Sequence, residues 1–87
     1  MKPVRLSKHA QGYTTSRGFT AAEVEEAIRT RPWGTAELGR LDCRKDFPYD
    51  RDWNGKPYAT RQVRPVFADN AEEIVVITVH TLLLLNP

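Results

Sequence analysis

The chain has 87 residues, of which 40% are apolar and 28% charged, so it suits one globular domain. Its only cysteine, Cys43, excludes a disulfide-stapled fold and a cysteine-rich zinc site. The sequence contains no apolar run long enough to span a membrane, and the N-terminal segment lacks the apolar stretch of a signal peptide. We therefore expect a cytoplasmic protein.

The formal net charge of +2 is unevenly distributed along the chain. Residues 1–64 carry all 13 Lys and Arg against 8 acids, a net charge of +5, whereas residues 65–87 carry three acids and neither Lys nor Arg. This asymmetry favours an anionic partner for one face of the protein, and an ordinary solvated surface is the alternative.

Two helices are expected in the N-terminal half. The first begins after Ser7, a good N-cap, and extends to Arg17, although Gly12 and the run 14–16 disfavour it. The second, over 21–31, begins with a Thr20–Glu23 capping box and stops before a proline.

Three strands are expected after residue 40. Residues 41–47 alternate between apolar and polar, and 58–67 form a second strand in which Pro65 implies an edge position or a bulge. Asn54-Gly55 predicts that the two form a hairpin, with Tyr49 and Trp53 in a long tip. Residues 73–81 are β-branched and predict a central, buried strand that 82–87 continue.

These elements predict one α+β domain over residues 1–87, with the order α-α-β-β-β. Two N-terminal helices would pack on a three- to four-stranded antiparallel sheet.

The first helix carries the most reactive pattern. His9, Tyr13 and Arg17 recur every four residues and would share one helical face. An imidazole moves protons near neutral pH and a guanidinium binds a phosphate, so the three groups suit phosphodiester cleavage. The alternative is that His9 and Arg17 only pack and cap at the two helix ends.

The strands add further charged and aromatic candidates. Lys45 shares a strand face with apolar residues and either reaches solvent at a sheet edge or points into a cleft. Arg61 and Arg64 fall on opposite faces of their strand, and His80, in line with Val76 and Thr78, is either a core or a cleft residue. The hairpin aromatics suit either base stacking or a small core under the loop. Neither a metal nor another cofactor is expected.

The chain carries an ordered set of short motifs: Ser7-x-His9-Ala10, Arg17-Gly18-Phe19, Glu23-Val24, Gly39-Arg40, Arg44-Lys45 and the strand 74–79. In this ordered set the chain resembles an uncharacterised family of small bacterial proteins. That family is distantly similar to the RelE/ParE-like toxin superfamily. The resemblance implies a toxin of a toxin–antitoxin pair, RNA as a substrate and a cognate antitoxin as a protein partner.

By position, the family's polar signature falls on His9, Arg17, Arg44 and Lys45. With Arg64 added from the strand pattern, the candidate catalytic residues are His9, Arg17, Lys45 and Arg64. The candidate nucleic-acid-binding residues are Tyr13, Arg44, Trp53 and Arg61.

Two functions follow from the sequence. The first is a toxin-like, metal-independent endoribonuclease that cuts RNA phosphodiesters. The second is a non-catalytic interaction or inhibitor module that pairs through its apolar C-terminal strand, because four consecutive leucines cannot all be buried in so small a chain. That strand, over 74–85, also predicts a homodimer.

Overall fold

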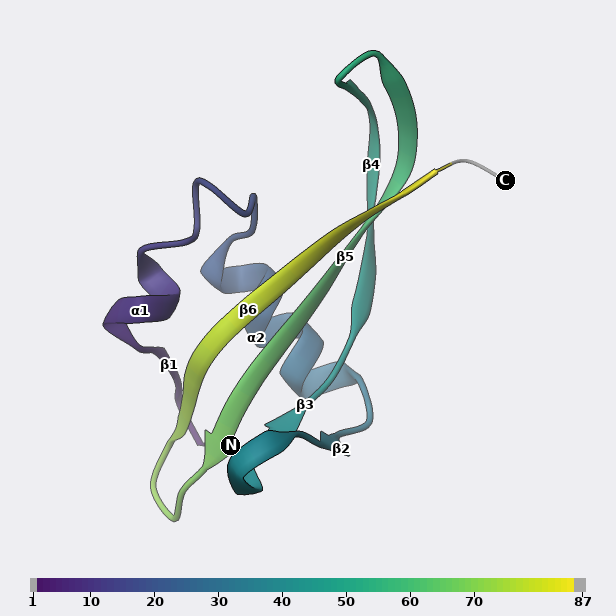
Figure 1. Ribbon diagram of the computed structural model, residues 1–87. Coiled ribbons are helices and arrows are strands. Elements are labelled where there is room, and N and C mark those ends of the chain that lie inside the picture. Colours follow the sequence, from purple (N-terminus) through teal and green to yellow (C-terminus); the bar gives the residue numbers. More distant parts are fainter. Residues whose placement is uncertain (1, 86–87) are drawn as a thin grey trace.

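Six strands and two helices make up the protein, whose structure here is a computed structural model that describes residues 2–85 (Figure 1). In chain order the elements are β1 (Val4–Leu6), α1 (Lys8–Gln11), α2 (Ala21–Thr30), β2 (Gly34–Thr35), the 3-10 turn η1 (Glu37–Gly39), β3 (Leu41–Asp42), β4 (Lys45–Trp53), β5 (Lys56–Asp69) and β6 (Ile74–Leu85).

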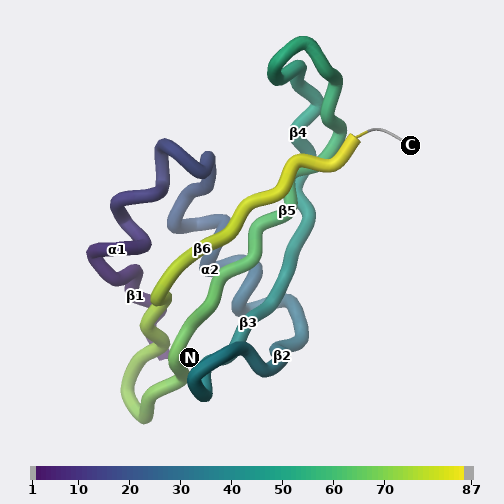
Figure 2. The backbone as a smooth tube through the Cα atoms, in the orientation of Figure 1, coloured from purple at the N-terminus to yellow at the C-terminus, as the bar shows by residue number. Residues whose placement is uncertain are grey.

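The strands form one mixed sheet with β5 at its centre. β6 pairs antiparallel with one side of β5, and β3 and β4 pair antiparallel with the other side. β1 lies parallel to the start of β6, and β2 pairs with β3 at the opposite edge. Figure 2 shows the long, twisted β5–β6 pair running through the whole molecule.

The expected architecture of two helices on a three- to four-stranded antiparallel sheet is wrong. The sheet has six strands, one of them parallel, and 50% of the chain is strand against 20% helix. A strand precedes the helices, because Val4–Leu6 hydrogen-bonds to β6 although it is too short to show a periodic pattern. The first helix is a single turn that ends at Gln11, and residues 12–18 form turns, as their poor helix propensity favours.

The second helix is confirmed. The Thr20 hydroxyl accepts a hydrogen bond from the Glu23 amide, and the Glu23 carboxylate accepts one from the Thr20 amide, so the capping box is complete. Val24, Ala27 and Ile28 are buried on the face toward the sheet.

The pairing of β5, which contains Pro65, explains how a central strand tolerates proline. β3 and β4 are separated at residues 43–44, opposite Pro65, so the missing proline amide interrupts no continuous ladder. The nearest register shift lies between Val66 and Phe67, where β6 and not the proline-containing strand has the extra residue.

The hairpin is also confirmed, but its tip is shorter than expected. Asn54 and Gly55 both have positive φ, as a two-residue hairpin turn requires, and Trp53 pairs directly with Lys56.

The last strand is long but is not the centre of the sheet. Its pairing with β5 skips from Val76 to Thr78, so Ile77 is an extra, bulged residue. The bulge reverses the alternation, and Val79 rather than Thr78 continues the buried face begun by Val76. The final two residues of the predicted strand extension lie outside the described part of the chain.

One face of the sheet carries the core. Buried side chains from α1, α2 and the inward positions of β5 and β6 pack together there, among them Ala10, Val24, Val63, Phe67 and Val79. Both helices lie on this side (Figure 1). Neither α1 nor α2 covers the other side, which we call the open face.

Candidate functional site on the open sheet face

Four basic side chains lie in one row across the open face. Arg64 of β5 pairs directly with His80 of β6, so their side chains stand next to each other on the same side. Asp42 pairs with Val66 and Lys45 with Val63, and the same count places Arg44 beside Arg64. With Arg17 at the outer edge of β6, these side chains form what we call the open-face row: Arg17, Arg44, Arg64 and His80.

Arg17 is fixed where the loop after α1 meets β6. Its guanidinium donates to the Val79 carbonyl at 2.9 Å and to the Thr78 hydroxyl at 3.3 Å. The Thr81 hydroxyl in turn donates to the Arg17 carbonyl at 2.6 Å. No carboxylate is paired with Arg17 within residues 2–85, so its positive charge is available at the row.

His80 is the titratable group of the row. Partial desolvation lowers the pKa of its imidazole, and the positive charges of Arg64 and Arg17 lower it further. The imidazole is nevertheless exposed, so solvent and solutes reach it. Near neutral pH this histidine is mostly unprotonated and can accept a proton.

Arg64 is held by an acid of the neighbouring strand. Its Nε and one terminal nitrogen contact the same Asp42 oxygen, at 2.8 and 2.6 Å. This contact leaves the second terminal nitrogen of Arg64 free to donate toward a ligand. The carboxylate thus orients the guanidinium beside His80 without surrounding it.

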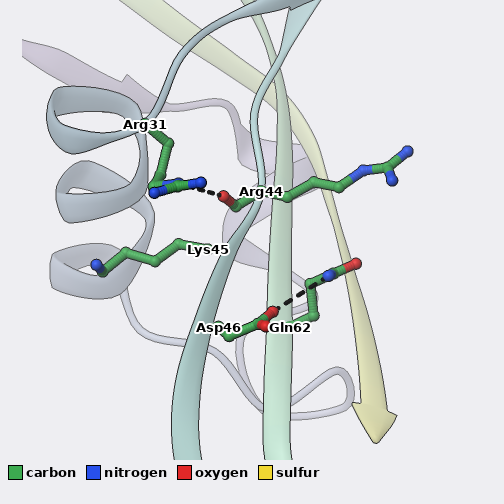
Figure 3. A pocket seen from close by; sticks show the side chains of 5 residues that line it. All are labelled: Arg31, Arg44, Lys45, Asp46 and Gln62. Atoms are coloured by element: carbon green, nitrogen blue, oxygen red, sulfur yellow. Dashed lines mark hydrogen bonds between the residues drawn. The ribbon is translucent and has the colours of Figure 1, made fainter.

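Arg44 extends the row toward the other edge of the sheet. Figure 3 shows its side chain reaching away from α2 and across β4 and β5, whereas Lys45 reaches toward α2. The Arg31 guanidinium donates to the Arg44 carbonyl at 3.3 Å, so it fixes the backbone rather than the side chain of Arg44. Arg31, Arg44 and Lys45 line one hollow of about 330 Å³, but their charges point in different directions.

The expected stack of His9, Tyr13 and Arg17 forms, although the helix that was to carry it ends at Gln11. The His9 and Tyr13 rings meet edge to face with centroids 4.8 Å apart. The Arg17 guanidinium lies 3.8 Å from the centre of the Tyr13 ring. Tyr13 therefore separates His9 from Arg17, and His9 lies at the end of the stack away from the row.

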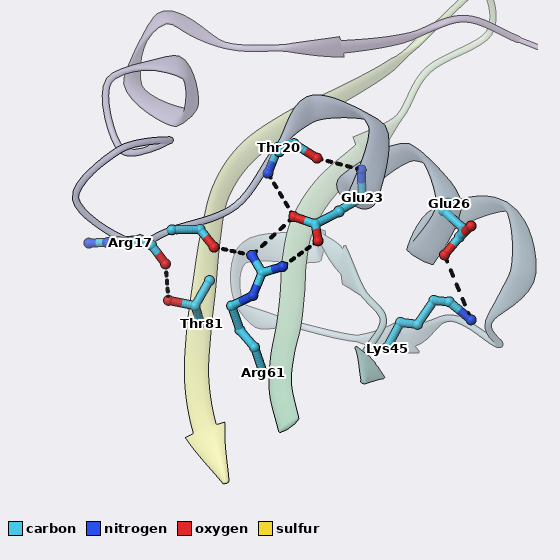
Figure 4. A network of polar contacts seen from close by, with 8 residues as sticks. Arg17, Thr20, Glu23, Glu26, Lys45, Arg61 and Thr81 are labelled. Atoms are coloured by element: carbon cyan, nitrogen blue, oxygen red, sulfur yellow. Dashed lines mark hydrogen bonds and ion pairs between the residues drawn. The ribbon is translucent and has the colours of Figure 1, made fainter. Parts of the chain in front are cut away.

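Two other predicted residues lie on the helix side of the sheet (Figure 4). Arg61 binds the Glu23 carboxylate through both terminal nitrogens, and one of them also donates to the Gly18 carbonyl. Lys45 pairs with the buried residue Val63 and places its amine 4.0 Å from Glu26. The Arg61 and Lys45 side chains are thus separated from His80 and Arg64 by the sheet.

The hairpin tip holds the last predicted residue. Trp53 is exposed, and its ring lies edge to face with Tyr58, with centroids 6.5 Å apart. The tip projects beyond the rest of the sheet (Figure 1), so Trp53 does not belong to the open-face row.

His80 is the site residue whose place the sequence pattern leaves undecided between core and cleft. Continuous alternation from Val76 would place it with the core side chains, and only the bulge at Ile77 turns it to the open face. The one signal in the sequence that marks His80 as a site residue is its presence in a β-branched strand, because titratable side chains are rare at central positions of such strands.

Neither helix of the described residues is long and apolar enough to cross a membrane. Residues 2–85 also contain no group of three His, Cys, Asp or Glu side chains arranged to hold a metal ion. No protein-family model, curated protein or solved structure matches the chain. The side chains of the open-face row are therefore the main indication of what the protein does.

Proposed function

We propose that the protein is an endoribonuclease whose acid–base group is His80. The observation that carries this proposal is the position of an exposed imidazole beside Arg64 and within reach of the Arg17 charge. An uncharged imidazole next to guanidinium groups supplies both requirements for cleaving an RNA phosphodiester, namely a base and a cationic phosphate site.

In the proposed reaction, His80 takes the proton of a ribose 2′-hydroxyl as the 2′-oxygen attacks the adjacent phosphorus. The bond from phosphorus to the 5′-oxygen breaks, and a 2′,3′-cyclic phosphate remains on the upstream fragment. The leaving 5′-oxygen receives a proton from the imidazolium, either directly or relayed by a water molecule. The same imidazole returns to its neutral form after that transfer.

The arginines would bind the phosphate and stabilise the charge that grows on it. Arg64 is already oriented by Asp42, and Arg17 by the β6 backbone, so neither pays a large ordering cost when substrate binds. A bound phosphate would also raise the pKa of His80, because its negative charge opposes the effect of the two guanidiniums.

Cleavage of a fluorescently labelled RNA oligonucleotide in the presence of a chelator tests this proposal. His80→Gln should lower the rate by about 10²–10⁴-fold, the usual contribution of an acid–base group. Arg64→Gln should lower it by about 10²-fold, as for other charge-stabilising donors. The matched control is Arg5→Gln, since Arg5 is an arginine of the edge strand β1 that is ion-paired with Glu73 and outside the row.

An oligonucleotide with 2′-deoxyribose at the cleaved position should resist the wild-type enzyme, because it lacks the attacking group. The His9→Ala variant separates the two histidines: we expect its rate to stay close to that of the wild type, because Tyr13 separates His9 from Arg17. A His80→Gln variant as active as the wild type would refute the proposal.

The toxin role is a further part of this proposal, supported by the resemblance described above. Induced expression in a bacterial host should arrest growth and degrade cellular RNA, and His80→Gln should do neither. Normal growth and intact RNA with the wild-type protein would count against a toxin.

A further inference from the structure

The outer edge of β6 is paired for only a quarter of its length. β1 covers Ile74–Val76, and the carbonyls of Ile77 and Val79 then bind the side chains of Ser7 and Arg17. Within residues 2–85 no strand pairs with this edge from Thr81 to Leu85. We call residues 81–85 the free edge.

The backbone of the free edge is ready to pair. The Val79 carbonyl points outward, since the Arg17 side chain reaches it from outside the sheet. Alternation along an antiparallel strand then turns the N–H and C=O groups of Thr81, Leu83 and Leu85 outward as well. Such a row of unpaired groups is a template for another strand, and natural edges of this kind are usually protected by charges or proline.

No such protection is present here. The segment from Ile74 to Leu85 contains no Lys, Arg, Asp or Glu. Leu82 and Leu85 are 55% and 57% exposed, and the exposed Trp53 lines one groove together with Leu82. Beside the edge runs a mainly apolar groove of about 560 Å³, to which Tyr49, Tyr58, Leu82 and Leu83 contribute.

We infer that the free edge pairs antiparallel with the free edge of a second copy, with Leu83 at the two-fold axis. The free edge itself carries no Lys, Arg, Asp or Glu, so an uncharged apolar strand that buries its leucines there is its natural partner, and this chain's own segment meets that requirement. In the symmetric register Leu83 meets its equivalent, Leu82 meets Leu84, and Thr81 meets Leu85. Each of the two surfaces is thus its own complement, as a two-fold dimer requires.

This inference is independent of the proposed ribonuclease function. Strand addition extends the sheet sideways at the end of β6 and leaves the open face uncovered. The earlier expectation of pairing over 74–85 is narrowed, because residues 74–76 are already occupied by β1.

Light scattering coupled to size exclusion, over a series of concentrations, tests the dimer. The wild type should have the mass of two chains, and Leu83→Lys should return it to the mass of one, because it buries two like charges at the axis. Leu38→Lys is the matched control, since Leu38 is 85% exposed on η1, away from the edge, and should leave the mass unchanged.

Disulfide trapping tests the register with a milder substitution. In an antiparallel hydrogen-bonded pair the Cα atoms lie about 5.5 Å apart, which a disulfide spans. With oxidised glutathione, Leu83→Cys should form a covalent dimer and Leu38→Cys should not. The native Cys43 is buried and should stay out of the cross-link.

Three results would overturn the inference: a wild type of single-chain mass at every concentration, a dimer that persists in folded Leu83→Lys, or a Leu83→Cys variant that cross-links no better than Leu38→Cys. Ribonuclease activity that is lost in His80→Gln while the dimer persists would show that the two proposals stand separately.

Discussion

Replacing Arg61 with leucine should destabilise the fold, although its charge and sequence position suggest a surface residue for binding nucleic acid. Arg61 and Glu23 keep only 15% and 20% of their side-chain surface exposed, and two arginine nitrogens bind the two carboxylate oxygens. Removal of the arginine leaves the Gly18 carbonyl without that donor, and the mostly buried Glu23 carboxylate loses both arginine nitrogens and keeps the Thr20 amide. Hydrogen bonds to charged groups contribute about 1.5–3 kcal/mol each, so we expect a loss of about 2–4 kcal/mol in the free energy of unfolding.

The second arginine–glutamate pair of the chain provides a matched control. Arg5 contacts Glu73 with the same two-point geometry, at 3.0 and 3.1 Å, but both side chains are more exposed, at 57% and 34%. Urea denaturation of Arg5→Leu should therefore show little change, because solvent screens an exposed pair. If Arg61→Leu is no less stable than Arg5→Leu, burial does not make the Arg61–Glu23 pair more important for stability than the exposed pair.

The pH dependence of stability gives a second measure of the same pair. Burial alone would raise the pKa of Glu23, but the hydrogen bonds from Arg61 and Thr20 and the Arg61 charge outweigh it and hold the pKa below its usual value. A carboxylate with a lowered folded pKa contributes stability above the unfolded pKa and loses it as pH falls through the folded one. The difference in stability between wild type and Arg61→Leu should therefore shrink in acid.

Three further predictions concern other parts of the chain. Nuclear magnetic resonance titration should place the pKa of His80 below its usual value, and Arg64→Gln should raise that pKa. A lowered histidine pKa means that the folded state favours the neutral imidazole. The contribution of His80 to stability is therefore present above the unfolded pKa near 6.5 and is lost as pH falls. Burial raises the pKa of the Cys43 thiol to about 11, so a thiol reagent at neutral pH should react with it only after denaturant unfolds the chain. Gly55→Ala should lower the free energy of unfolding by about 1 kcal/mol, measured in urea, because alanine is strained at the positive φ of the hairpin turn.

Local signals were sufficient for the elements that local interactions determine. The α2 helix and the β4–β5 hairpin were predicted correctly, because a capping box and an Asn-Gly turn act within a few residues of the chain. The same kind of signal cannot reveal β1, a three-residue strand whose partners lie about 70 residues further along. The six-stranded mixed sheet was missed for that reason.

The candidate site shows where the strand pattern stops being informative. Arg17 and Arg64 were selected from the sequence; Arg64 pairs with His80, and the Arg17 guanidinium binds the carbonyl of the preceding residue, Val79. His80 itself was left undecided between core and cleft, and one inserted residue, Ile77, turns it away from the helices. Nothing in a run of β-branched residues shows where such an insertion falls, since each of them would suit either face.

The parallel pairing of β1 with β6 sets an order on folding during synthesis. The first strand leaves the ribosome long before the residues that hydrogen-bond to it, and α2 emerges before β5, the strand on which it packs. The apolar face of α2 must therefore remain uncovered until translation reaches β5, and β1 must remain unpaired until it reaches the final strand. A chain that stalls before residue 74 would lack the partner of β1 and the strand that buries one side of β5, which makes it a ready target for chaperones and proteases.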